Sequence, residues 1–159
     1  MTEDDFKPAS RPPQAQEWSV PEDDVYWYEA VVDDAGISRR VPHVNNAEYV
    51  RWIDCVAVLA GIRAGSTRER LDREGLLWFV ARHEVDYRGE TFPGDDIVAA
   101  TWLSDWTKIS VIRHTVFARP GDGRLLCTAT TRWVMVDRAT RRPTRIPEDL
   151  LLRVERPSR

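Results

Sequence analysis

The residues with the clearest potential for chemistry lie just before one apolar segment, between His43 and Asn46. A helix that starts at Asn46 leaves the backbone N–H groups of Asn46, Ala47 and Glu48 without intrahelical acceptors. These amides point outward at the positive end of the helix dipole, so they suit a group that develops negative charge. Asn46 is favoured as the helix N-cap, whereas Asn45 is equally compatible with capping and with contacting a substrate.

The segment that follows is predicted to be a helix from Asn46 to about Ala60. Apolar side chains recur at intervals of three and four residues, and the polar ones form only a narrow stripe. Gly61 is a typical helix stop. Because the later apolar segments are predicted strands, we expect a sheet to cover most of this helix. The side chains expected in the core are Tyr49, Ile53, Val56 and Leu59.

Five other segments have the aromatic and β-branched composition of strands. Their order predicts one strand, the buried helix and then an antiparallel meander of four strands, with a hairpin loop at Pro120-Gly121-Asp122-Gly123. Alternation in the second segment places every other residue from Phe79 to Tyr87 on one face. The five segments are residues 25–32, 76–88, 96–106, 108–119 and 124–137.

The composition is that of an ordinary soluble protein. Of the 159 residues, 31% are charged and 42% hydrophobic, and the net charge is -3. This balance gives no reason to expect nucleic acid or a membrane as a partner. Cys55 and Cys127 lie in a predicted helix and a predicted strand, so they indicate neither a disulfide framework nor a metal site, and no cofactor is expected. Buried thiols of this kind favour a reducing, cytoplasmic location.

Residues 1–22 are expected to form a disordered amino-terminal tail, and residues 23–159 a single domain. The tail is rich in Pro, Glu, Asp and Gln, and it carries too little apolar surface to offset the entropy lost on ordering. Trp18 is its one expected docking point.

Several motifs, taken in order, resemble the hotdog-fold thioesterases of the 4-hydroxybenzoyl-CoA thioesterase-like superfamily. They are the HVNNxxYxxW entry to the helix at His43, the FVARHEVDY strand at 79–87, the turn at Pro93 and the closing segment from Arg142 to Glu148. A shorter match, Glu84 to Glu90, resembles acyl-acyl-carrier-protein thioesterases. The resemblance implies an α+β fold with one long central helix wrapped by a curved antiparallel sheet. It also implies hydrolysis of acyl thioesters of coenzyme A or acyl carrier protein.

The resemblance further implies that His43 acts as a base or holds the attacking water. Relatives often carry an Asp four residues earlier, where this chain has Arg39, so a catalytic carboxylate must come from elsewhere. One candidate is Asp34, which also suits the opening of a turn. The other is Glu90, which takes the place of a Glu in the carrier-protein enzymes, next to Thr91 in the place of their Cys. Both of these residues are also typical of a strand end that faces solvent.

Two features bear on partners. The pair Arg39 and Arg40 could contact the phosphates of coenzyme A or lie in a solvated loop. The tryptophans supply more aromatic surface than one helix covers, which together with the resemblance predicts a homodimer or homotetramer joined by sheet edges, with clefts at the interface. These tryptophans are Trp78, Trp102, Trp106 and Trp133.

The absence of the usual Asp leaves a second function open. A non-catalytic hotdog module would bind an acyl or aromatic ligand in the same cleft without hydrolysing it. A hydratase of this fold would carry an Asp and a His on an equivalent loop, and that signature is not visible here.

Overall fold

The computed structural model describes residues 1–38 and 40–155, and its centre is the helix α1, Asn46–Arg63. Trp52, Ile53 and Val56 on α1 are almost completely buried, which confirms the predicted buried helix. The helix passes through Gly61, where the sequence predicted its end, and the Ala64 N–H still donates to the Ala60 carbonyl. A glycine inside a helix costs only about 1 kcal/mol relative to alanine, so continued packing outweighs that local signal.

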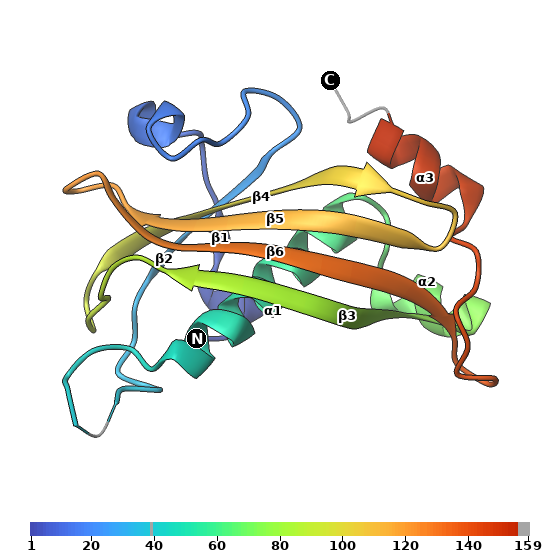
Figure 1. Ribbon diagram of the computed structural model, residues 1–159, viewed down its shortest axis with the longest axis horizontal. Coiled ribbons are helices and arrows are strands. Elements are labelled where there is room, and N and C mark those ends of the chain that lie inside the picture. The colour runs from blue at the N-terminus through green and yellow to red at the C-terminus, as the bar shows by residue number, and fades with distance from the viewer. Residues whose placement is uncertain (39, 156–159) are drawn as a thin grey trace.

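One antiparallel sheet curves over α1 (Figure 1), in the strand order β1-β2-β4-β5-β6-β3. This is the α+β hotdog architecture that the sequence predicted. The predicted four-strand meander was wrong, because only β4, β5 and β6 are consecutive neighbours and β3 pairs with β6 at the far edge. The strands are β1 (Lys7–Pro8), β2 (Tyr26–Val31), β3 (Leu76–Tyr87), β4 (Asp96–Trp106), β5 (Ser110–Arg119) and β6 (Arg124–Asp137).

The edge strand β3 departs from the simple alternation that its sequence indicates. Its register with β6 shifts between Val80 and Arg82, which leaves one extra residue in β3. A bulge of this kind reverses the faces on its two sides. Phe79 is therefore 57% exposed, whereas His83 and Val85 beyond the bulge are half-buried. The predicted shared face of Phe79 and His83 was wrong for this reason.

Two short helices lie together at the end of the sheet opposite the β5–β6 hairpin (Figure 1). They are α2 (Arg68–Glu74) and α3 (Glu148–Glu155). The Arg70 guanidinium joins them, because two of its nitrogens lie 2.7 Å from the Asp149 carboxylate oxygens. Within the described ranges, no helix has the length and apolar character needed to span a membrane.

Residues 1–22 differ from the expected disordered tail. They contain two 3-10 helices, η1 (Glu3–Asp5) and η2 (Pro13–Gln16), and β1 pairs with β2 at the sheet edge. Phe6 packs on the α1 side of the sheet, whereas Ala15 and Trp18 are buried against the opposite face. The segment orders because its few apolar side chains dock on an apolar sheet face, which composition alone does not reveal.

The prediction of a homo-oligomer rested in part on tryptophans that one helix could not cover. The packing within one chain accounts for most of that aromatic surface. Trp102 packs beside the amino-terminal segment and stacks on His114 with ring centroids 5.3 Å apart. Trp78 and Trp133 pack in the cluster that includes Leu150 of α3. These three tryptophans are thus partly buried within one chain, whereas Trp106 is 39% exposed.

Replacing Trp18 with alanine tests this arrangement. Its side chain is only 4% exposed, and its indole N–H donates to the Gly123 carbonyl at 2.8 Å. Trp18→Ala should lower the free energy of unfolding by about 3–5 kcal/mol, measured by urea denaturation. Glu22→Ala, at an exposed position in the same segment, should change it by less than about 0.5 kcal/mol. Equal stability of the two variants would show that the segment does not dock.

Candidate active site

The loop before α1 is held as a narrow hairpin. Ile37 and Val44 form a bridge, and the Asn45 N–H donates to the Gly36 carbonyl at 2.8 Å. Gly36 has a φ of 75°, and a Cβ atom there would lie 2.1 Å from the Cγ atom of Glu48. A glycine is therefore required at this position, because the buried Glu48 side chain occupies the space beside it. This packing fixes the loop relative to the first turn of α1.

Asn45, rather than the predicted Asn46, is the N-cap of α1. Its Oδ1 atom accepts the Ala47 N–H at 2.9 Å, and its carbonyl accepts the Glu48 N–H at 2.9 Å. The amides of Ala47 and Glu48 are thus already occupied, contrary to the expectation that both are free to bind a substrate. The Asn46 N–H has no acceptor among the described residues. Since the Asn45 side chain caps through its oxygen, its NH₂ group is also left as a donor.

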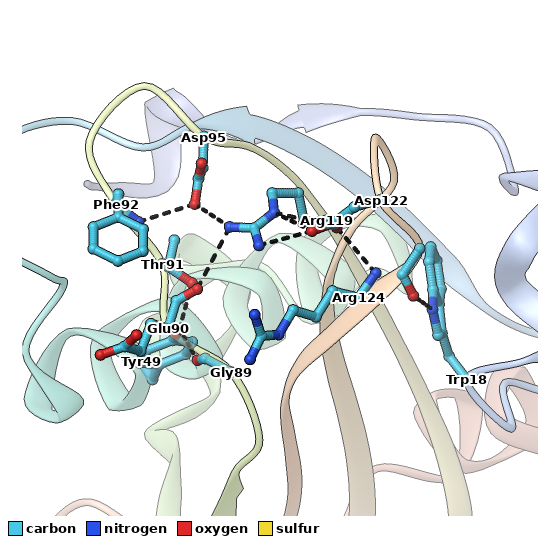
Figure 2. Close-up of polar contacts among 11 residues, drawn as sticks. Trp18, Tyr49, Gly89, Glu90, Thr91, Phe92, Asp95, Arg119, Asp122 and Arg124 are labelled. Atoms are coloured by element: carbon cyan, nitrogen blue, oxygen red, sulfur yellow. Dashed lines mark hydrogen bonds and ion pairs between the residues drawn. The ribbon is translucent and has the colours of Figure 1, made fainter.

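A second loop, residues 88–95 between β3 and β4, forms the other wall. The Val44 N–H donates to the Thr91 carbonyl at 2.8 Å, which joins the two loops directly. The hydroxyls of Thr91 and Tyr49 lie 2.5 Å apart, and the Tyr49 hydroxyl also donates to the Gly89 carbonyl at 3.4 Å (Figure 2). Thr91 is 1% exposed, so its hydroxyl joins this loop to α1 and is not presented to a substrate.

Arg119 at the end of β5 holds the second loop in place (Figure 2). Its guanidinium donates to Asp95 at 2.7 Å, to Asp122 at 2.9 Å and to the Glu90 carbonyl at 3.5 Å. Asp95 in turn accepts the Phe92 N–H at 2.9 Å. The hydrogen bonds to Asp122 and Asp95 raise the pKa of Arg119, so the group is charged at any relevant pH. Sequence reasoning missed Arg119, because no motif marks it.

His43 and Glu90 meet where these two loops adjoin. The His43 Nδ1 atom lies 3.0 Å from Glu90 Oε1, and both side chains keep access to solvent, at 28% and 59% exposure. In the neutral tautomer that donates from Nδ1 to this carboxylate, Nε2 keeps its lone pair. Glu90 is one of the two candidate carboxylates that the sequence indicated, and its contact with His43 forms within one chain. An imidazole with a free Nε2 lone pair is suited to general-base chemistry, and this one lies beside the start of α1.

The other predicted site residues do not join this pair. Asp34 is exposed, and its carboxylate has no hydrogen-bond partner among the described residues. Its neighbour Asp33 instead accepts the Ala35 N–H and forms an ion pair with the chain's amino terminus at 3.1 Å. Arg40 is exposed near the hairpin, and Arg39 lies outside the described residues.

The remaining candidates for chemistry are inert. Burial raises the pKa of Cys127 to about 12, so its thiol is protonated near neutral pH and is a poor nucleophile. His83 is bound to Thr131 with Nδ1 and Oγ1 2.8 Å apart, as expected of a satisfied core histidine. In the described part of the chain, no group of three or more His, Cys, Asp or Glu side chains is placed to hold a metal ion.

Tyr87 is a further residue at the site that sequence reasoning did not single out. Its hydroxyl donates to the Asn46 carbonyl at 3.1 Å, and its ring packs edge-on against Tyr49 with centroids 5.6 Å apart. Because Tyr87 belongs to the edge strand β3, the start of α1 lies beside an unpaired sheet edge. The strand position alone gives no signal of this contact across 41 residues.

Known proteins resemble this chain in sequence and in fold. A family model described as the thioesterase-like superfamily matches residues 34–154. A chloroplastic palmitoyl-acyl carrier protein thioesterase of Gossypium hirsutum is 32% identical over 99 residues, which are 62% of this chain and 24% of the relative. The chain thus matches about a quarter of that relative's length.

Two solved structures share the fold. A Staphylococcus aureus protein solved in complex with CoA superimposes with a TM-score of 0.79 at 16% identity, over 86% of this chain and 85% of that chain. A 1,4-dihydroxy-2-naphthoyl-CoA thioesterase from Synechocystis superimposes with a TM-score of 0.76 at 12% identity, over 84% of this chain and 97% of that chain. At these identities the structures show a common fold.

The contact between Gly36 and Glu48 gives a test of the site's framework. Gly36→Ala adds a Cβ atom into the Glu48 side chain and strains a positive φ, whereas Gly94→Ala strains a similar φ of 87° with no atom within 4 Å. Thermal unfolding should show a loss of about 1–2 kcal/mol for Gly94→Ala and a clearly larger loss for Gly36→Ala. Similar losses would mean that Glu48 does not pack against this glycine.

Proposed function

Because the chain belongs to the thioesterase-like superfamily, we propose that it hydrolyses acyl thioesters of coenzyme A or acyl carrier protein. The observation that carries this proposal is the His43–Glu90 pair, with 3.0 Å between Nδ1 and Oε1, at the amino end of α1. A base fixed by a carboxylate and a free amide at a helix start are the two elements that attack by water on a carbonyl requires.

The proposed reaction begins with a water molecule at Nε2 of His43. As the water attacks the thioester carbonyl, its proton passes to Nε2, and Glu90 stabilises the resulting imidazolium through Nδ1–H. The oxyanion forms beside the Asn46 N–H, with the Asn45 NH₂ group as a second donor. When the C–S bond breaks, His43 returns the proton to the departing thiolate. The products are the free acid and the thiol.

The proposal covers two carriers of the acyl group, coenzyme A and acyl carrier protein. The Gossypium relative is named for a carrier-protein substrate, and the Synechocystis structure for a coenzyme A substrate. The Staphylococcus protein of the same fold was solved with CoA. Arg40, exposed on the hairpin that carries His43, is available to a phosphate of either carrier.

We also propose that the chain assembles as a homodimer through β3, with the homotetramer as the larger alternative. This twelve-residue strand is paired only on its β6 side, and a long unpaired edge favours association. Phe79 is exposed on β3, and Tyr87 on the same strand contacts the start of α1. The interface would therefore border the site. The free thiols of Cys55 and Cys127 support the proposed reducing, cytoplasmic location.

Substitution of the two carboxylates and the histidine tests the reaction. His43→Ala should lower kcat/KM on the best thioester by roughly a hundredfold or more, the usual contribution of a positioned base. Glu90→Gln should cause a comparable loss, because an amide cannot stabilise the imidazolium. Asp34→Asn, the matched carboxylate control, should retain activity. The measurement is thiol release from short, long and aromatic acyl-CoA compounds.

Two results would contradict this assignment. A large loss in Asp34→Asn with an active Glu90→Gln would make Asp34 the working carboxylate. An absence of thiol release from every substrate by the wild-type chain, together with binding of the same compounds, would favour a non-catalytic module.

The proposed assembly has a separate test. Wild-type protein should scatter light as a dimer or larger at micromolar concentration. Phe79→Glu should shift the protein toward the monomer, because it places a charge on the β3 edge. Val31→Glu, at a residue 60% exposed on β2, should leave the assembly unchanged. A wild-type monomer would contradict the proposal.

A further inference from the structure

A cavity of about 1040 Å³ lies between the second half of α1 and the concave face of the sheet. It begins near Asp54, roughly 10 Å along the helix from Ala47. Its walls come from α1, α2, β3, β4, β5, β6 and the Leu150 region of α3. Most of its lining side chains are apolar, and they include Leu76, Trp78, Leu103, Val111 and Ile146.

Arg113 is the one buried residue among the described charged residues that line this cavity. Arg113 on β5 is only 7% exposed, and its one hydrogen bond to a described residue runs from Nη1 to Thr101 Oγ1 at 3.1 Å. A guanidinium has five N–H donors, so most of them have no acceptor in the protein. No carboxylate of the described residues forms an ion pair with it.

Arg113 is buried without a carboxylate partner among the described residues. Burial lowers the pKa of Arg113 to about 10, which still leaves the group protonated at neutral pH. Besides burial, the groups that act on the pKa of Arg113 are the nearby Tyr28 and Tyr26, which raise it. The acidic residues that line the cavity are half-buried Glu3 and exposed Asp54, Glu69 and Asp72, and none of them forms an ion pair with Arg113. A buried cation without a partner costs stability, so a ligand that neutralises it gains affinity.

A second unsatisfied donor lines the same cavity. The Trp133 Nε1 atom is buried and has no hydrogen-bond partner. Trp133 on β6 pairs with Val111, two residues from Arg113 on β5. Such diagonal neighbours lie roughly 7–8 Å apart, within reach of long side chains. Two side chains on adjacent strands therefore line the same cavity with N–H groups that have no acceptor among the described residues.

We propose that this cavity binds an apolar chain or ring that ends in a carboxylate, with the carboxylate held by Arg113 and assisted by the Trp133 N–H. The apolar walls account for the body of the ligand and the guanidinium for its charged end. The identity of that ligand rests on the proposed function: it is the acyl group of the thioester, whose far end carries a free carboxylate.

Binding to the full-length chain tests the site without reference to hydrolysis. Titration calorimetry with dodecanoate and with dodecan-1-ol compares two ligands that differ only in the charged end. Dodecanoate should bind the wild type roughly tenfold to a hundredfold more tightly, the range for a buried hydrogen bond to a charged group. Arg113→Met keeps a long apolar side chain and should abolish this preference.

Two further variants make the result specific. Arg132→Met removes an exposed arginine of β6, which lines neither the cavity nor the site, and should retain the full preference. Trp133→Phe keeps an aromatic ring but removes the N–H, and it should reduce the preference for dodecanoate severalfold. This variant still tests the site if Arg113→Met does not fold. Equal affinity of the wild type for the two ligands, a preference that survives in Arg113→Met, or an undiminished preference in Trp133→Phe would overturn the inference.

Rates of thioester hydrolysis show whether a failed test rejects this inference or the proposed function. The wild type should show a higher kcat/KM on the mono-CoA thioester of a dicarboxylic acid than on the acyl-CoA of equal length with a methyl end. Arg113→Met should lose that difference while it still hydrolyses the methyl-ended substrate. Carboxylate binding without hydrolysis of any thioester would reject the proposed function and keep the binding site. Hydrolysis without an Arg113-dependent preference would reject the inference alone.

Discussion

The burial of α1 against one face of a curved sheet is the constraint on which the rest of this structure depends. A helix with Trp52, Ile53 and Val56 almost fully enclosed needs cover on several sides, and a single flat sheet face cannot provide it. The sheet supplies cover by curving, and the amino-terminal segment packs against another side of the helix. Because the helix cannot slide within this enclosure, its amino end occupies one fixed place relative to the strand ends.

That fixed place gives the candidate active site its geometry. Two loops far apart in sequence meet there through the Val44–Thr91 main-chain hydrogen bond, and Arg119 braces the second loop from β5. His43 and Glu90 are brought together by this framework rather than by their own local structure. Both side chains keep solvent access, as general-base chemistry on an entering substrate requires. The contacts that hold the two loops in place therefore also hold His43 and Glu90 beside each other.

The opposite end of α1 borders a region that is less closely packed and contains a buried charge. Close packing would favour an apolar side chain in place of Arg113, since its charge is buried without a counter-ion and the surrounding residues are largely apolar. The cavity beside it is a further departure from tight packing. A ligand with a free carboxylate, as proposed for this cavity, would neutralise Arg113 and fill the space beside it.

Local sequence patterns determined much of this protein. The three-and-four spacing of apolar residues identified α1, alternation and turn residues located β4 and β6 at their observed bounds, and the motif that starts at His43 indicated the family. These succeed because periodicity records which side of an element is buried. The position of Glu90 in a matching strand also marked it as a candidate.

Only the tertiary structure decided the features that depend on contacts between distant residues. It placed β3 beside β6, and its bulge turned Phe79 outward. It paired His43 with a carboxylate 47 residues away and left Asp34 in solvent. It ordered the first 22 residues on a sheet face that does not exist in the unfolded chain. Register, loop closure and docking are set by the summed packing of the whole domain, so no local pattern encodes them.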